Sequence, residues 1–240
     1  MKKFAVFDID GTLIRWQLYH AVVDKLAKRN ILGTNAHQQL HDARMAWKRR
    51  ESSESFQEYE KQLINIYESS LPNIEPALFD ELAEEVAKEY TDQTYVYTRD
   101  LAQQLKQKGY MLLAISGSHK ELIAHVAKRY RFDDWIGTTY ERLNGTFSGN
   151  KHIPSLNKQA ELESFISKHQ LTLHGSYAIG DSKNDITVLN MVDNPIAFNP
   201  DKELFKQAQK NHWPIVIERK NVIYELHYKD GHYILAQTGR

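Results

Sequence analysis

The stretch Phe4-Ala5-Val6-Phe7-Asp8-Ile9-Asp10-Gly11-Thr12 places four apolar residues directly before two acids, a glycine and a threonine. A short apolar run that ends at polar residues is typical of a buried parallel strand. Ligands of open α/β sheets gather at the carboxyl ends of the strands. Because side chains alternate along a strand, we expect Asp8 and Asp10 to point the same way, one to attack and one to handle a proton. By itself the segment also fits a surface turn, since Asp, Gly and Thr are common turn residues.

Further apolar runs along the chain have the same character, and helical patterns lie between them. These runs are Met111–Ile115, Tyr177–Ile179 and the weaker Ile196–Phe198. Thr98 is predicted to cap a helix that carries Leu101 and Leu105 and stops at Gly109. The alternation of strands and helices predicts a doubly wound α/β core with a parallel sheet.

Residues 16–91 interrupt this alternation, because the segment contains no convincing strand and shows about four amphipathic helical patterns. Thr34 is predicted to cap the second helix, and Pro76 to open the fourth. The tail contains Lys229-Asp230-Gly231, a turn signal for a β-hairpin. We therefore expect a discontinuous core, an inserted all-helical cap and a C-terminal hairpin extension, which would comprise residues 1–15 with 92–217, 16–91, and 218–240.

A second acidic cluster follows another predicted strand far along the chain. Gly180-Asp181-Ser182-Lys183-Asn184-Asp185 comes directly after the run Tyr177–Ile179 and repeats the order of strand, glycine and paired acids. Because carboxyl ends of parallel strands meet at one edge of a sheet, we expect Asp181 and Asp185 to lie near Asp8. Carboxylate oxygens are hard ligands, and this set suits Mg²⁺ better than zinc.

An acidic pocket repels a phosphate group unless hydroxyl donors and cations offset its charge. Ser116 follows the second predicted strand, where its hydroxyl and the amide of Gly117 are placed to bind phosphate oxygens. Lys158 stands at the start of a helical pattern upstream of the second acidic cluster and is the favoured cation. Lys151 and Lys183 are alternatives, and a Ser-Gly-Ser loop or a solvated lysine is ordinary by itself.

The composition limits the class of partner. The chain has 240 residues, of which 41% are hydrophobic and 26% charged, as in ordinary globular proteins. Lys plus Arg and Asp plus Glu are 31 each, so no positive excess indicates nucleic acid or a membrane surface. A small-molecule partner fits better. The sequence contains no cysteine, which excludes disulfides and thiolate chemistry. We expect a cytoplasmic protein, a monomer or a homodimer, with no membrane span.

These elements resemble the four ordered motifs of the haloacid dehalogenase (HAD) superfamily. The motifs are Asp8-Ile9-Asp10-Gly11-Thr12, Ser116, Lys158 and Gly180-Asp181-Ser182-Lys183-Asn184-Asp185. The resemblance runs to about Ile217. Asn194-Pro195-Ile196-Ala197-Phe198-Asn199-Pro200, with Trp213-Pro214-Ile215, is similar to the phosphoserine-phosphatase-like branch of subfamily IB. The resemblance implies a HAD-like core with a helical cap, and a phosphatase acting on a small phosphorylated metabolite.

The resemblance also implies a role for each acid. Asp8 would attack phosphorus to form an aspartyl phosphate, and Asp10 would protonate the leaving alcohol and then activate water. Magnesium would be held by the Asp8 side chain, the Asp10 backbone carbonyl and Asp181, with Asp185 in support. The acid two residues after the nucleophile favours a phosphatase over a dehalogenase, which lacks it.

Ser116 and Lys158 would hold the phosphoryl oxygens, assisted by Asn184. Phosphoserine phosphatases carry a glutamate shortly after the first motif, but the corresponding residue here is Gln17, and an amide attracts an ammonium group less than a carboxylate does. Free phosphoserine is therefore disfavoured, and Gln17 and Arg15 are candidate substrate selectors. A phosphotransferase or phosphomutase would share every motif, and a non-catalytic phospholigand-binding module would keep the fold.

Overall fold

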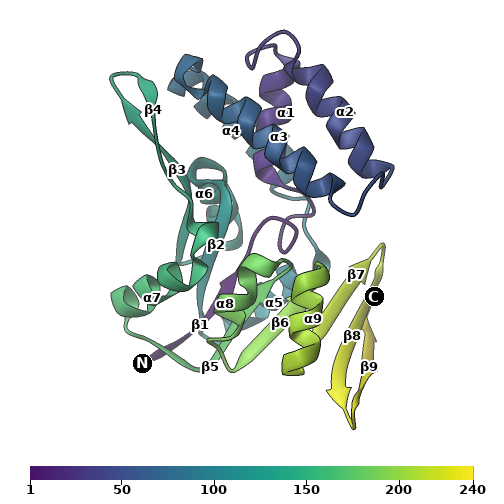
Figure 1. The fold of residues 1–240 in the computed structure, drawn as a ribbon. Helices are drawn as coiled ribbons and strands as arrows, with labels where there is room; N and C mark the ends of the chain where they lie inside the picture. Colours follow the sequence, from purple (N-terminus) through teal and green to yellow (C-terminus); the bar gives the residue numbers. More distant parts are fainter. Residues whose placement is uncertain (240) are drawn as a thin grey trace.

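The computed structural model describes residues 1–239, and the side chains of residues 1–236. A nine-stranded sheet forms its centre, in the order β4-β3-β2-β1-β5-β6-β7-β8-β9 (Figure 1). The strands are β1 (Lys2–Phe7), β2 (Met111–His119), β3 (Asp134–Leu143), β4 (Thr146–His152), β5 (Leu171–Gly180), β6 (Asn194–Phe198), β7 (Ile215–Arg219), β8 (Val222–Lys229) and β9 (His232–Gly239).

The α-helices of the described residues are α1 (Leu18–Lys28), α2 (Ala36–Lys48), α3 (Ser55–Ser70), α4 (Pro76–Tyr90), α5 (Val96–Gln107), α6 (Lys120–Tyr130), α7 (Lys158–His169), α8 (Ile186–Leu189) and α9 (Lys202–Asn211). Short 3₁₀ helices are η1 (Leu71–Asn73), η2 (Pro154–Leu156) and η3 (Lys183–Asp185). Within residues 1–239, every helix is too short or too polar to span a bilayer.

The strands from β3 to β7 in the sheet order run parallel, and antiparallel strands flank them at both ends. β1 lies between β2 and β5, so the chain builds one half of the sheet and then crosses β1 to build the other. In open α/β sheets such a switch point is where ligands bind, at the carboxyl ends of the strands. The predicted fold class, a doubly wound parallel sheet, is confirmed.

Alternate residues of β1 serve two separate apolar layers. Ala5 and Phe7 pack with α5 and α6 on one face of the sheet, whereas Phe4 and Val6 pack with α7, α8 and α9 on the other. Side chains of a strand alternate between the two faces, and a strand covered on both faces is apolar throughout. The uninterrupted run before Asp8 therefore reflects burial on both sides of the sheet.

Helices α1–α4, the cap helices, follow β1 directly and form a group above the sheet in Figure 1, coloured purple to blue. Pro76 is the first residue of α4, as predicted. The prediction that Thr34 caps α2 is wrong, because Asn35 precedes the helix. The N–H of Ala36 donates to the carbonyl of Gly33 at 3.2 Å and closes a turn. Thr34 and Asn35 are the two residues inside this turn.

The prediction that Thr98 caps α5 is also wrong. Thr98 lies inside the helix, and its hydroxyl donates to the carbonyl of Thr12 at 2.7 Å. The first amides of α5 are capped by a residue of β7 instead. The Glu218 carboxylate accepts from the N–H groups of Val96 and Tyr97 at 3.0 and 2.9 Å. A carboxylate at a helix N-terminus complements its free amides and its dipole.

The hairpin β3–β4 is absent from the sequence predictions. Its strands lie at the edge of the sheet and are half exposed, with mixed polar and apolar residues, so no clear alternation marks them. The hairpin rises toward the cap in Figure 1, and β4 packs on η1. The core therefore reaches up to the cap on this side.

The C-terminal hairpin β8–β9 turns at the predicted residues and extends the sheet, because β8 pairs with β7. The Tyr233 hydroxyl bonds to the carbonyls of Ala208 and Trp213, both at 2.8 Å, and joins the hairpin to α9. We propose the division into core 1–15 and 92–217, cap 16–91 and extension 218–240, although β7 crosses the last of these boundaries.

Candidate active site

Asp8 is the first residue after β1 and lies at the switch point of the sheet. Its backbone N–H donates to the carbonyl of Ile179 in β5 at 2.9 Å, which fixes the backbone at this position. Lys158, the first residue of α7, donates from Nζ to Oδ1 of Asp8 and to Oδ1 of Asp185, both at 2.6 Å. The lysine is only 3% exposed. One buried ammonium group therefore joins the first acidic cluster to the second.

Burial raises the pKa of Asp8 from its usual 3.8 to about 7. The charge of Lys158 opposes this rise in pKa, and the charges of Asp185 and Asp10 add to it. Burial alone lowers the pKa of Lys158, but the carboxylates of Asp185 and Asp8 outweigh it and leave this pKa above its ordinary value. The lysine therefore stays charged, while the nearby carboxylates compete for the one positive charge that it supplies.

Asp8, Asp181 and Asp185 form a group of three carboxylates, each offering an oxygen within 4.8 Å of the others. Burial, followed by the charges of Asp8 and Asp185, raises the pKa of Asp181 well above its usual value. Ionising all three acids beside one lysine would leave an excess of negative charge, which together with burial is why Asp8 and Asp181 hold a proton more tightly than usual. A donor set made only of carboxylate oxygens, at this spacing, fits a hard divalent cation.

Two glycines allow the acids to approach the backbone this closely. A Cβ on Gly11, whose φ is 84°, would overlap the Asp181 carboxylate, and a Cβ on Gly180 would overlap the Asp185 side chain. Ser182 fixes Asp185, because its N–H and its hydroxyl both donate to Oδ2 of Asp185 at 3.0 Å. The glycines in both predicted motifs are therefore steric requirements of the cluster.

Asp10 is buried and held by three donors. Oδ1 accepts from the Leu18 N–H at 2.6 Å and from the Ser118 hydroxyl at 2.9 Å, while Oδ2 accepts from the Ser116 hydroxyl at 2.7 Å. Burial raises the pKa of Asp10, and the hydrogen bond from Ser116 is the largest opposing influence. The sequence predictions include Ser116 but not Ser118. Their spacing of two within one extended segment was a usable signal, since such residues share a face.

The remaining predicted phosphate ligands are less enclosed. Gly117 is half-buried, and Asn184 is exposed on η3. Of the alternative lysines, Lys151 pairs with Glu68 of α3, and Lys183 is exposed to solvent. Lys158 is thus the lysine that the structure places against the acids.

The two predicted substrate selectors lie in different surroundings. The Gln17 side-chain nitrogen is 3.5 Å from the position that a Cβ on Gly11 would take, so its amide lies beside the carboxylates. Arg15 is exposed, and its guanidinium lies 5.6 Å from the centre of the Tyr95 ring. The structure places the Gln17 amide near Gly11 of the acidic motif, and the Arg15 guanidinium over Tyr95 instead.

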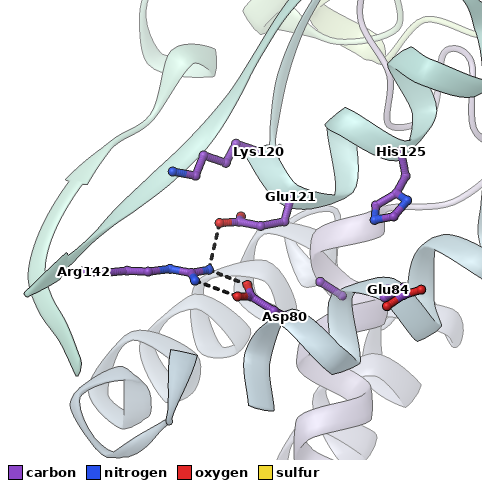
Figure 2. Close-up of a pocket in the computed structure, with 7 residues that line it drawn as sticks. Asp80, Glu84, Lys120, Glu121, His125 and Arg142 are labelled. Carbon is purple, nitrogen blue, oxygen red and sulfur yellow. Dashed lines mark hydrogen bonds and ion pairs between the residues drawn. The ribbon is translucent and has the colours of Figure 1, made fainter. Parts of the chain in front are cut away.

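A cavity of about 460 Å³ lies away from these carboxylates (Figure 2). It is bordered by Asp80 of α4, Glu121 of α6 and Arg142 of β3, so it belongs to the junction of cap and core. Arg142 bonds to both Asp80 oxygens at 2.6 and 2.8 Å and to Glu121 at 2.9 Å. Three of the residues that line the cavity thus pair with one another, and none of the lining residues belongs to the predicted site.

A doubly wound sheet with acids and a buried lysine at its switch point is the arrangement of an α/β enzyme with a carboxylate site. The sequence profile of the haloacid dehalogenase-like hydrolases matches residues 5–190. The chain belongs to this family.

Two curated relatives match almost their whole length. A histidinol-phosphatase of Neisseria meningitidis serogroup C (strain 8013) is 30% identical, covering 90% of this chain and 99% of the relative. A phosphoserine phosphatase of Lactococcus lactis subsp. lactis (strain IL1403) is 25% identical, covering 95% and 96%. The predictions of the HAD family and of a phosphatase are confirmed.

A solved structure has the same fold. The phospho-aspartyl intermediate analogue of a phosphoserine phosphatase superposes with a TM-score of 0.63 at 21% identity, covering 91% of this chain and 94% of that one. At this identity the likeness concerns the fold.

Proposed function

We propose that the chain hydrolyses a small phosphomonoester through a covalent phosphate on Asp8, with Mg²⁺ as cofactor. The observation that carries the proposal is the buried Lys158, shared between Asp8 and Asp185 beside Asp181 at the end of β1. Phosphoryl transfer through a covalent intermediate requires a nucleophilic carboxylate, a neutralising lysine and a cation-binding acid cluster close together.

In the first step, an Asp8 carboxylate oxygen bonds to phosphorus as the bond from phosphorus to the alcohol oxygen breaks. Asp10 gives its proton to that oxygen, so the alcohol leaves neutral. In the second step, Asp10 takes a proton from water as the water oxygen bonds to phosphorus, and Asp8 leaves as a carboxylate. The products are the alcohol and inorganic phosphate.

Lys158 and the hydroxyl of Ser116 offset the charge of the phosphoryl oxygens during both steps. Mg²⁺, held by the side chains of Asp8, Asp181 and Asp185, would supply the positive charge that the acid cluster lacks. The donors come from separate elements and are already in place, which reduces the reorganisation needed in the transition state.

The cap favours a small substrate. Helix α1 begins at Leu18, whose N–H is 2.6 Å from Asp10, so the cap stands directly over the acids. The relatives are named for phosphate esters of histidinol and serine, which are both amino alcohols. We propose this class of ester, with Gln17 close enough to contact the alcohol part in place of the glutamate of phosphoserine phosphatases, which disfavours free phosphoserine within the class. Histidinol phosphate and phosphoserine are the esters to compare first, ranked by kcat/KM.

The test is release of inorganic phosphate from 4-nitrophenyl phosphate by the full chain with Mg²⁺. Asp8→Asn removes the nucleophile and is expected to lower kcat by about 10³-fold or more. Asp230→Asn, in the exposed turn of the β8–β9 hairpin, is the matched control and keeps full activity.

Acid-quenched protein should carry one phosphate group on Asp8, seen by mass spectrometry of its peptides. Free phosphate should remain the product when an alcohol is added, whereas a new phosphate ester would indicate a phosphotransferase. An Asp8→Asn variant that keeps its activity would contradict the proposed mechanism.

A further inference from the structure

Ser118 is a buried serine at the end of β2 that lies outside the four motifs. Its hydroxyl donates to Oδ1 of Asp10 at 2.9 Å and accepts from the N–H of Tyr19 at 2.9 Å. We infer that Ser118 is a positioning residue, which holds one oxygen of Asp10 so that the other delivers the proton to the leaving group. The inference rests on the proposed role of Asp10 as proton donor.

The directions of these hydrogen bonds follow from the groups themselves. A backbone N–H can only donate, so Ser118 Oγ accepts from Tyr19, and its single proton is left for Asp10. The Leu18 N–H donates to the same Asp10 oxygen at 2.6 Å. Two donors therefore occupy Oδ1 of Asp10 and leave it little capacity to carry a transferable proton.

The second oxygen of Asp10 is held differently. Oδ2 accepts from the Ser116 hydroxyl at 2.7 Å, and Ser116 Oγ itself accepts from the Ser118 N–H at 2.9 Å. In the proposed reaction the Ser116 hydroxyl binds a phosphoryl oxygen, and its one proton cannot serve both partners. When the substrate takes this hydroxyl, Oδ2 is released, whereas Oδ1 keeps both of its donors.

Oδ2 of Asp10 is therefore the oxygen that carries the proton. As the phosphorus–oxygen bond breaks, its electron pair takes the proton from Oδ2, and the alcohol leaves. The Asp10 carboxylate that remains is stabilised through Oδ1 by Ser118 and Leu18. In the second step Oδ2 accepts a proton from the attacking water, which restores the acid. Ser118 keeps the carboxyl group in one orientation for both transfers.

The dependence of rate on the leaving group tests this inference. 4-Nitrophenol leaves readily without a proton, whereas phenol needs one, and their phosphate esters are close in shape. The full chain with Mg²⁺ is assayed on both esters, as wild type and as Ser118→Ala, Ser118→Cys and Asp10→Asn. Ser176→Ala is the matched control, because Ser176 is also buried and makes two hydrogen bonds, to Phe4 and Thr172, away from the acids.

The measured quantity is the ratio of kcat/KM for 4-nitrophenyl phosphate to that for phenyl phosphate, which does not depend on the folded fraction of a variant. Ser118→Ala is expected to raise the ratio about tenfold, part of the roughly 10²- to 10⁴-fold that a positioned acid contributes. Asp10→Asn should raise it further. The ratio for Ser118→Cys, whose thiol is a weaker donor, should fall between those of the wild type and Ser118→Ala. The ratio for Ser176→Ala should match that of the wild type.

A Ser118→Ala variant with the wild-type ratio would overturn the inference, whether its activity on the two esters is unchanged or equally reduced. That result would leave the proposed function standing, since the nucleophile is tested separately by Asp8→Asn.

Discussion

Lys158 is the side chain on which the geometry of the acid cluster depends. Its ammonium group lies 2.6 Å from an oxygen of Asp8 and 2.6 Å from an oxygen of Asp185, and all three side chains are buried. Without this charge the two carboxylates would face each other in a region of low dielectric constant, where like charges repel strongly. Lys158 thus has a structural role as well as the proposed role toward phosphate.

Replacing Lys158 by methionine keeps much of the volume but removes the charge. We expect the free energy of unfolding to fall by about 3 kcal/mol, because removing one partner of a buried ion pair leaves the other charge unpaired. Phosphatase activity should be lost as well. Urea unfolding and phosphate release measure the two effects. Lys183→Met, at an exposed lysine next to the same acids, is the control and should unfold like the wild type.

At the scale of elements, the cap is attached to the core through more than the chain connections. His119 of β2 stacks on Tyr19 of α1 with ring centres 4.9 Å apart, and its Nε2 lies 2.9 Å from the Tyr67 hydroxyl of α3. Burial lowers the pKa of His119 to about 3, so the ring is neutral within this aromatic junction. The β3–β4 hairpin adds Arg142, which bonds to α4 and α6 together (Figure 2).

Arg142→Met is expected to loosen α4 without unfolding the core. The change removes the bonds from β3 to Asp80 of α4 and to Glu121 of α6, which join cap to core. Hydrogen exchange followed by mass spectrometry should show faster exchange in Pro76–Tyr90 and unchanged exchange in α7.

The control for this prediction is Arg129→Met, which removes a more exposed ion pair, with Asp92. Surface ion pairs contribute little by themselves, so this variant should leave exchange in α4 unchanged. Equal exchange rates of α4 in Arg142→Met and in the wild type would contradict the prediction and show that the bonds of Arg142 are not needed to hold α4.

At the scale of the whole molecule, the acid cluster links stability to pH and, with the proposed Mg²⁺ bound, to the metal. The pKa of Asp8 is about 7 in the folded chain and 3.8 when unperturbed. From about pH 4 to pH 7 the folded chain therefore keeps a proton that the unfolded chain has released, so the contribution of Asp8 to stability falls as the pH rises. The proposed Mg²⁺ would compete with this proton, because a ligand carboxylate must be ionised.

We therefore expect Mg²⁺ to raise the melting temperature little at about pH 5 and most above about pH 7. A magnesium concentration about 100 times the Kd adds about 2.7 kcal/mol to the free energy of unfolding. Thermal unfolding with Mg²⁺ and with a chelator, over this pH range, measures the effect. Asp8→Asn should show a smaller increment with weaker pH dependence. An increment that is independent of pH in the wild type would contradict the proposed role of Asp8 as a magnesium ligand.

The parts of the fold that local patterns encode were predictable. The apolar runs before Asp8 and Asp181 and the four cap helices appear in the sequence because continuous burial and a period of 3.6 residues leave marks within a few positions. The helical pattern placed Lys158 at the start of a helix, and Lys158 is the first residue of α7. These features are set by residues close together in the sequence, or by single positions where the chemistry allows only one type of side chain.

Other features were decided only by tertiary contacts. Glu218 caps α5 across 122 positions, and Ser116 meets Asp10 across 106, so no local pattern marks either pair. The β3–β4 hairpin is held by the sheet edge and the cap rather than by its own alternation. Ser118 became significant once the fold placed it between α1 and Asp10. The sequence determined which groups are available for chemistry. The tertiary fold, which brings β2 and the start of α1 to Asp10, decided which oxygen of Asp10 each donor holds, because hydrogen bonds act over only about 3 Å.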